Sequence, residues 1–438
     1  GGLANAADKV QKLDNALKAM EDTMTLFYQH KGLSNEAGNT RGNNALPAQH
    51  LNIRYMRMFA GAFMYASGNH IGIEWGSAGL ASGPSNWDGF GWGVAHEIGH
   101  DINQGTYAVA EITNNYFAQL LTIATKGTRF QYPNVYKKVT SGSLGRSSNV
   151  ATQLALYWQL HLAYDDNKDD RHIYDDYEEQ FNNLFFARVD TYSRNPAKAP
   201  QEGLKLDGGA DQNLMRLSCA AANKNILPFF ERWGMEPDVA TKAYADLYGK
   251  PETKALYYVN DTVRDYRVDH PETAEAAITD KNVVASAKAE AAAAGSNMVN
   301  VTITADSTYN DVLHGYEIVR KMTSNGKTQS ETAGFIEADA SGTTVFTDTI
   351  AAINNRVINY EVRAVDKYLN YSAAKDAGFV KIQTDGQLEK AQWTIEAENL
   401  TAQADTVLIP GDSGAAGDDW IIDDPDSGYD ASNPSNVP

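Results

Sequence analysis

The feature that most restricts the fold of this chain is the sequence His96-Glu97-Ile98-Gly99-His100, which follows the small and apolar residues 92–95. Two histidines four residues apart lie on one face only if the segment is helical, because residues i and i+4 are neighbours on a helix surface. Both imidazoles can then bind one metal ion, and zinc readily accepts such ligands. The motif therefore predicts a helix that carries two of the ligands of a zinc site.

A catalytic zinc site needs a third protein ligand and one open position. A metzincin would have glycine at position 103 and histidine or aspartate at 106, whereas this chain has Asn103 and Thr106. Glu111 follows a turn and lies in the amphipathic run VAEITNNYF, so two helices joined by a short connection could bring it to the ion. Asp101 is a competing ligand, but its place beside His100 points it elsewhere on the helix. We therefore expect Glu111 to be the third ligand.

Two further residues have expected roles in the chemistry. Glu97 lies between the histidines, where a carboxylate can take a proton from metal-bound water and pass it to the leaving amine. Asn115 comes four residues after Glu111, on the same helical face, where an amide can accept the second N–H of a metal-binding imidazole. An ordinary amide on a helix surface is an equally good interpretation of Asn115.

Candidate substrate contacts are aromatic and imidazole side chains near the motif. Trp87 and Trp92 could stack on sugar rings, although tryptophan more often packs in the protein interior. Tyr65 and His70, in the apolar segment before the motif, are further candidates for substrate contact. Three residues could stabilise an oxyanion but have the spacing of a buried helix face: Tyr157, His161 and Tyr164.

The chain reads as several domains, because 438 residues exceed the size of one ordinary core. Residues 1–270 predict a mainly helical domain with a small sheet, since helical spacing over 4–31 is followed by short apolar runs over 51–75 and then by helical patterns. Alanine-rich residues 271–296 predict a helical linker. Alternating residues 297–385 predict an all-β sandwich. Residues 386–438 form an acidic tail or begin another module.

Charge and composition exclude several classes of partner. The formal net charge is −19, and no cluster of Lys or Arg is present, which argues against nucleic acid and anionic membranes. We find no apolar run long enough to span a membrane and no signal peptide, and the chain reads as a piece of something longer. A single cysteine, Cys219, is expected to be a buried thiol, so disulfides and a cysteine-based metal site are excluded. The acidic cluster over 418–426 lacks the spacing of a calcium loop.

The amino-acid sequence around the motif resembles the enhancin-like family of zinc metallopeptidases, which belong to the gluzincins. The resemblance rests on HEIGH, a glutamate followed by TNN on the next helix, MYASGNHIGI, WDGFGWGVAHEIGHDINQ and ILPFFERWGMEPD, and it covers about residues 40–250. It implies a gluzincin-like catalytic domain, with His96, His100 and Glu111 as zinc ligands and Glu97 as the base. Residues 297–385 loosely resemble a fibronectin type III or immunoglobulin-like domain, especially in NYEVRAVDKYLNYS.

For bacterial members, this resemblance implies secretion or display on the cell surface and cleavage of O-glycosylated, mucin-type proteins. It also implies that the strand before the motif, within residues 61–73, pairs with the substrate backbone. Two alternatives remain: a zinc peptidase that is indifferent to glycans, and a surface glycan-binding protein whose metal site is not catalytic. The intact Glu97 argues against the last, because a purely structural site needs no base.

Overall fold

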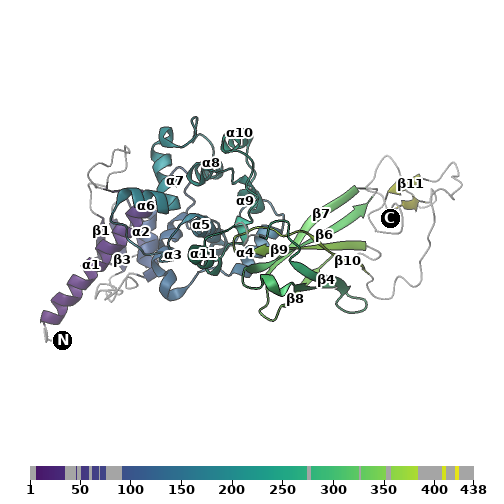
Figure 1. The fold of residues 1–438 in the computed structure, drawn as a ribbon. Helices are drawn as coiled ribbons and strands as arrows, with labels where there is room; N and C mark the ends of the chain where they lie inside the picture. The colour runs from purple at the N-terminus through teal and green to yellow at the C-terminus, as the bar shows by residue number, and fades with distance from the viewer. Residues whose placement is uncertain are drawn as a thin grey trace. The chain divides into compact units, whose positions relative to one another are not determined.

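The structure is a computed structural model, and it describes residues 6–34, 46, 51–58, 62–68, 70–74, 91–273, 278–324, 327–351, 357–382, 407–410 and 420–423. The chain divides into two compact units, one made of Gly1–Val139 and Ser143–Pro271, the other of Thr140–Gly142 and Glu272–Pro438. The first unit contains the helices, drawn from purple to teal in Figure 1, and the second contains most of the strands, drawn in green. No helix within the described ranges is long and apolar enough to cross a membrane.

A small sheet of three strands precedes the motif helix, as the sequence predicts. Its order is β1-β3-β2, with β1 (Asn52–Met56) parallel to β3 (His70–Glu74), and β2 (Met64–Ser67) antiparallel to β3. Strand β2 therefore lies at an edge of this sheet. Helix α2 (Gly91–Ile102) packs on both β2 and β3.

The rest of the first unit is helical, which confirms the predicted helical body. Its further helices are α1 (Ala6–His30), α3 (Thr113–Lys126), α4 (Tyr132–Thr140), α5 (Val150–Tyr164), α6 (Tyr177–Asn183), α7 (Phe185–Arg194), α8 (Ala210–Ala222), α9 (Leu227–Arg232), α10 (Val239–Ala245) and α11 (Asp261–Asp269). Helix α5 is buried along nearly its whole length, which explains why its sequence is apolar on all sides.

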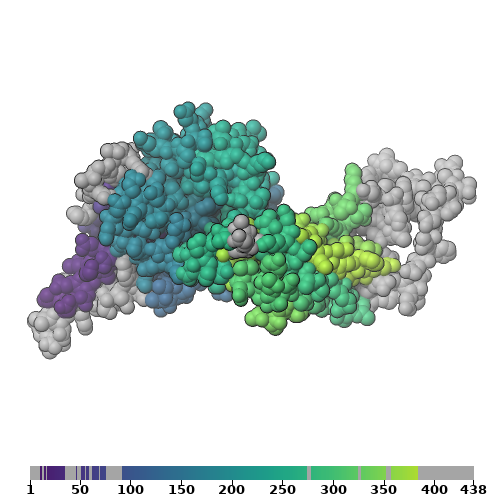
Figure 2. All heavy atoms as spheres, viewed as in Figure 1, coloured from purple at the N-terminus to yellow at the C-terminus, as the bar shows by residue number. Residues whose placement is uncertain are grey.

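Helix α1 is divided into an exposed and a buried part. Val10 and Leu17 are exposed near its beginning, whereas Leu26, Phe27 and His30 are buried near its end. The purple beginning of this helix projects from the blue and teal surface of the unit (Figure 2). Only the second half of α1 therefore belongs to the core.

The second unit is a sandwich of two antiparallel sheets around one apolar core. One sheet has the order β10-β9-β6-β7 and the other β4-β5-β8. The strands are β4 (Val284–Ala291), β5 (Met298–Ala305), β6 (Leu313–Ser324), β7 (Lys327–Glu337), β8 (Thr343–Thr349), β9 (Val357–Asp366) and β10 (Lys375–Lys381). The predicted all-β character of this part is confirmed, whereas its fibronectin or immunoglobulin identity stays a prediction.

The predicted helical linker over 271–296 is wrong, because residues 284–291 form strand β4. Val284 and Ala289 face the sandwich core, and β4 pairs with β5 along its length. Pairing and burial thus outweigh the helix propensity of alanine. The sandwich consequently begins before residue 297. In the acidic tail the described residues are two short paired strands, β11 (Val407–Pro410) and β12 (Trp420–Asp423).

Candidate metal centre

Helix α2 presents His96 and His100 on one side and buries the other. Val94, Ala95, Ile98 and Gly99 are its buried residues. The two imidazole rings lie 4.8 Å apart between centroids and nearly perpendicular, at 87°. Their side chains are 18% and 27% exposed, so both remain accessible from solvent. The i, i+4 spacing therefore brings both rings to one place, as the motif predicts.

Gly99 allows helix α3 to approach α2 closely enough to share this site. A Cβ atom at this position would lie 2.4 Å from the backbone oxygen of Asn114 and 2.8 Å from its Cα. Any larger residue would force the two helices apart, because real Cβ atoms do not tolerate such contacts. The glycine inside the motif is thus explained by helix packing.

Glu111 lies in the turn before α3 and reaches both histidines. Its Oε2 is 3.2 Å from His96 Nε2, and its Oε1 is 3.2 Å from His100 Nε2. Its φ of 64° is in the left-handed region, which a residue with a side chain seldom adopts. Strain of this kind commonly occurs at functional sites. The structure therefore brings together the three ligands expected from the sequence.

The connection between α2 and α3 is held by helices α7 and α8. The Tyr107 hydroxyl donates to Asp190 Oδ1 at 2.6 Å, and Ser193 Oγ donates to Thr106 Oγ1 at 2.8 Å. Asn213 Nδ2 donates to the backbone oxygen of Thr106 at 3.0 Å. These contacts fix the path of the chain on its way to Glu111.

The side chains of His96, His100 and Glu111 fit a zinc ion. Each offers one ligand atom, and these atoms all lie within 4.8 Å of one another. Ligands of a tetrahedral zinc at about 2.0–2.1 Å are about 3.3 Å apart, close to the separation of Glu111 from each imidazole nitrogen. Two nitrogens and one carboxylate form the donor set of a catalytic zinc site with an open fourth position. Glu111, at 60% exposed, leaves that side accessible.

Asn115 supports this group through both ends of its amide. Its Oδ1 lies 2.5 Å from His96 Nδ1, so the ring can donate there while Nε2 faces Glu111. Its Nδ2 donates to the backbone oxygen of Glu111. One side chain therefore orients an imidazole and also holds the strained turn, a double task that the sequence did not indicate.

The preceding residue, Asn114, was missed by the sequence analysis. It is fully buried, and its Nδ2 lies 3.0 Å from His100 Nε2 and 3.3 Å from His96 Nε2. Its Oδ1 is buried without a hydrogen-bond partner. The only available signal was the repeated amide in TNN, which does not distinguish one asparagine from the other.

Two acidic residues of α2, Glu97 and Asp101, are not among the three candidate ligands. Burial raises the pKa of Glu97, while His96 and His100 oppose that rise. Burial also raises the pKa of Asp101, while His70, His100 and a hydrogen bond from the Gly68 backbone oppose it. Asp101 is not among the residues whose ligand atoms gather at the site. This agrees with the expectation that it points elsewhere.

The proposed substrate contacts near the motif are largely engaged within the protein. The Tyr65 hydroxyl lies 2.9 Å from His70 Nε2, and its ring covers Gly72, where a Cβ atom would lie 2.1 Å from the ring. Trp92 is covered on one face by the Arg129 guanidinium, 4.4 Å from the ring centroid. Trp87 lies outside the described residues.

The three residues considered for oxyanion stabilisation belong to the interior. Tyr157 and His161 are 1% exposed, and Tyr157 accepts a hydrogen bond from Arg146. The Tyr164 ring stacks on Phe185, 5.1 Å away. The alternative interpretation of this run, a buried helix face, therefore holds.

Comparisons with known proteins found one matching family model and several similar solved structures. A family model described as peptidase M60, enhancin and enhancin-like matches residues 4–234. No curated protein matches the chain. The M60 catalytic domain of Clostridium perfringens ZmpC, solved in complex with the sialyl T antigen, is similar, with a TM-score of 0.55 and 20% identity, over 82% of this chain and 62% of that one.

Two further solved structures from Clostridium perfringens share the fold. The catalytic module of the metalloprotease ZmpA has a TM-score of 0.52 and 19% identity, over 83% of this chain and 62% of that one. The ZmpB M60 catalytic domain with the CBM51-1 and CBM51-2 domains has a TM-score of 0.55 and 21% identity, over 84% of this chain and 34% of that one. This chain thus spans less than two thirds of each.

Proposed function

Because the chain belongs to the peptidase M60, enhancin and enhancin-like family, we propose that it is a zinc-dependent endopeptidase that hydrolyses peptide bonds of O-glycosylated, mucin-type proteins. The observation that carries the proposal is the position of the Glu111 carboxylate, 3.2 Å from the Nε2 atoms of both His96 and His100. A structural zinc site is normally closed by four protein ligands, whereas the residues that the structure describes offer three here. The arrangement favours catalysis.

His96, His100 and Glu111 would hold the ion, which when bound supplies a Lewis acid for the scissile carbonyl and for water. Glu97 takes a proton from the attacking water and delivers it to the leaving amine nitrogen. Burial raises the pKa of this carboxyl group, which favours proton uptake. Asn115 keeps His96 in the tautomer whose Nε2 lone pair faces the metal.

The substrate assignment draws on the family and on the edge strand. The similar ZmpC catalytic domain was solved in complex with the sialyl T antigen. Strand β2 lies at the sheet edge and packs on α2, so an extended peptide could pair with it whatever its side chains. Recognition would then depend on the sugar, with Trp87 as the candidate stacking residue.

The second unit and the location of the protein belong to the same proposal. The two-sheet arrangement of four and three strands supports a fibronectin type III-like or immunoglobulin-like spacer or partner-binding module. We place the protein outside the bacterial cell or on its surface, where O-glycosylated proteins are encountered. Neither assignment affects the chemistry of the metal centre.

Metal analysis and turnover test the catalytic roles. Alanine at His96, His100 or Glu111 should lower zinc content, because each removes one of three ligands. Glu97→Gln should keep zinc and lose turnover, since it removes the base without removing a ligand. Asp101→Asn is a matched control on the same helix, because Asp101 lies outside the ligand group. Full hydrolysis by Glu97→Gln would refute the role of Glu97.

A pair of peptides tests the substrate class. A mucin-derived glycopeptide should be cleaved much faster than the same peptide without its sugar, because a site that hydrogen-bonds a hydroxyl strongly disfavours a substrate lacking it. Trp87→Ala should narrow this difference. Trp92→Ala, whose ring is covered by Arg129, should affect both peptides alike. Equal cleavage would favour the glycan-indifferent peptidase, and binding without cleavage would favour the glycan-binding protein.

A further inference from the structure

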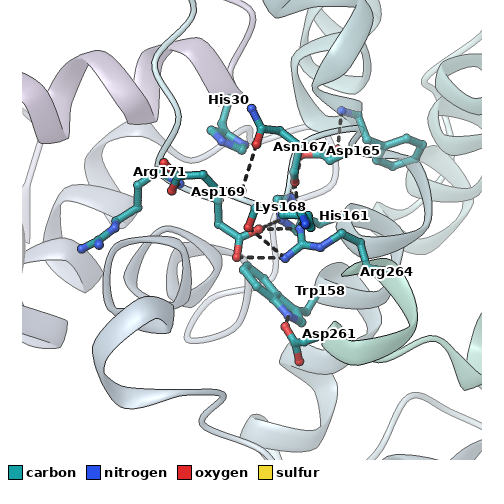
Figure 3. A network of polar contacts seen from close by, with 12 residues as sticks. His30, Trp158, His161, Asp165, Asn167, Lys168, Asp169, Arg171, Asp261 and Arg264 are labelled. Carbon is teal, nitrogen blue, oxygen red and sulfur yellow. Dashed lines mark hydrogen bonds and ion pairs between the residues drawn. The ribbon is translucent and has the colours of Figure 1, made fainter. Parts of the chain in front are cut away.

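A second group of metal-binding side chains lies inside the helical unit. His161 on α5 is sandwiched between two carboxylates, with its Nδ1 2.8 Å from Asp165 Oδ2 and its Nε2 2.8 Å from Asp170 Oδ1. Arg264 on α11 donates to the same Asp170 oxygen at 2.7 Å. Figure 3 shows His161 and Arg264 together at the centre of this network. The indole of Trp158 stacks on the His161 ring, 4.5 Å away.

His30, at the end of α1, completes the group from the other side. Its Nδ1 lies 2.9 Å from the Tyr116 hydroxyl, which in turn lies 3.1 Å from His161 Nδ1. One ligand atom each from His30, His161 and Asp165 lies within 4.8 Å of the others, and all three residues are buried. Burial lowers the pKa of His30 to about 4, so its ring is neutral and keeps a lone pair.

A small pocket adjoins this group. Three carboxylates and three imidazoles line it, and no Lys or Arg does: Asp165, Asp169, Asp170, His30, His161 and His172. Asp165 Oδ2 is buried and lies 2.8 Å from His161 Nδ1. A cation between these two atoms, a proton or a metal ion, stabilises the buried carboxylate.

The surroundings of His161 match those of a metal-binding imidazole. Such a ring usually donates its second N–H to a carboxylate, which orients the ring and raises its basicity. Here Asp170 occupies that position opposite Asp165, and Arg264 holds Asp170 in place. The motif site has the same arrangement, with the Asn115 amide behind His96. Both sites thus pair a ligand group with a supporting partner.

We propose that His30, His161 and Asp165 form a second, buried zinc site, with the Tyr116 hydroxyl placed as a fourth ligand. Two imidazoles and one carboxylate suit zinc, whereas calcium requires more oxygen ligands. The His161–Asp165 contact would widen from 2.8 Å to the about 3.3 Å that separates ligands of a tetrahedral zinc. The proposal does not depend on the peptidase activity.

The ion would connect three helices of the unit. His30 lies at the end of α1, Tyr116 lies on α3 and His161 lies on α5. In its absence a proton has a similar role: burial opposes the charge on His161, but Asp165 and Asp170 outweigh burial and raise its pKa to about 9. Zinc would take the place of that proton between the same side chains, and its coordination by residues of three helices would stabilise the unit that carries Glu111.

Counting zinc in a variant without the motif site tests the proposal. The full chain carrying His96→Ala and His100→Ala should retain about one zinc after dialysis against zinc-free buffer. Adding Asp165→Asn should reduce the content to near zero, because it removes a charged ligand with little change of shape. Adding Asp166→Asn is the matched control and should leave one zinc, since Asp166 is exposed and does not line the pocket.

Diffraction provides a readout that does not require Asp165→Asn to fold. Crystals of the His96→Ala, His100→Ala protein grown with zinc chloride should give an anomalous peak at the zinc edge between His30, His161 and Asp165. If the double variant bound no zinc and its crystals showed no such peak, the proposal would be overturned. The His161, Asp165 and Asp170 side chains would then be bridged by protons alone. Zinc that persists after Asp165→Asn would also overturn the proposal. The peptidase assignment is refuted by a different result, an unaltered protein that shows no turnover or holds no zinc at the motif.

Discussion

Replacing Glu111 by glycine should separate the strain of its backbone from the function of its carboxylate. Its φ of 64° places the Cβ atom in a conformation that costs an L-residue about 1–2 kcal/mol. Alanine keeps that Cβ atom and glycine does not, while both remove the carboxylate. Against this, glycine lowers the free energy of unfolding by about 0.4–1 kcal/mol relative to alanine, because it gives the unfolded chain more conformational freedom. The balance leaves metal-free Glu111→Gly about 1 kcal/mol more stable than Glu111→Ala.

Urea unfolding of the two metal-free variants measures this difference. An advantage of about 1 kcal/mol corresponds to about 2–4 °C in Tm for a unit of this size. Ala124→Gly, at an exposed position of helix α3, is the matched control. It should lower stability by about 1 kcal/mol, the opposite sign, because glycine is unfavourable within a helix.

The same pair of variants also reports on the metal. Both should lose the zinc of the motif site, because neither has a third ligand. If Glu111→Gly were no more stable than Glu111→Ala, the left-handed conformation would not be a source of strain. If either retained that zinc, Glu111 would not be the third ligand. The two conclusions are thus refuted by different measurements.

Three further predictions concern residues around the two helices and the core. Gly99→Ala should destabilise the protein by about 1–3 kcal/mol and weaken zinc binding in titrations, whereas Gly105→Ala, with open space around its Cβ position, should change stability by less than about 0.5 kcal/mol. Asn115→Asp should lower the free energy of unfolding by about 1–3 kcal/mol, because a carboxylate cannot donate to the Glu111 carbonyl; unchanged urea unfolding would contradict this. Burial raises the pKa of the Cys219 thiol to about 12, so a thiol reagent at pH 8 should label it only after unfolding, and fast labelling of the native protein would argue against burial.

Local patterns predicted the elements whose formation depends on neighbours in the sequence. The spacing of His96 and His100 requires only a helix, and burial of one face of α2 places both rings together. Apolar periodicity likewise predicted the helical body and the strands before the motif. Where a residue pattern and its burial agree, the sequence is sufficient.

Long-range packing decided the features that the sequence did not reveal. Alanine-rich residues 284–291 favour a helix by propensity, but pairing with β5 makes them a strand. The left-handed turn at Glu111 and the double hydrogen bonding of Asn115 depend on helices α7 and α8 holding the preceding loop.

By itself, the sequence identified the motif, the proposed base and the candidate third ligand, because these residues lie within one short stretch of chain. Only the tertiary structure brought His30 to His161 and Asp165, and placed Arg264 behind Asp170. These residues are far apart in sequence and follow no spacing rule. Their proximity results from packing α1, α5 and α11 in one core, where buried charges must find partners.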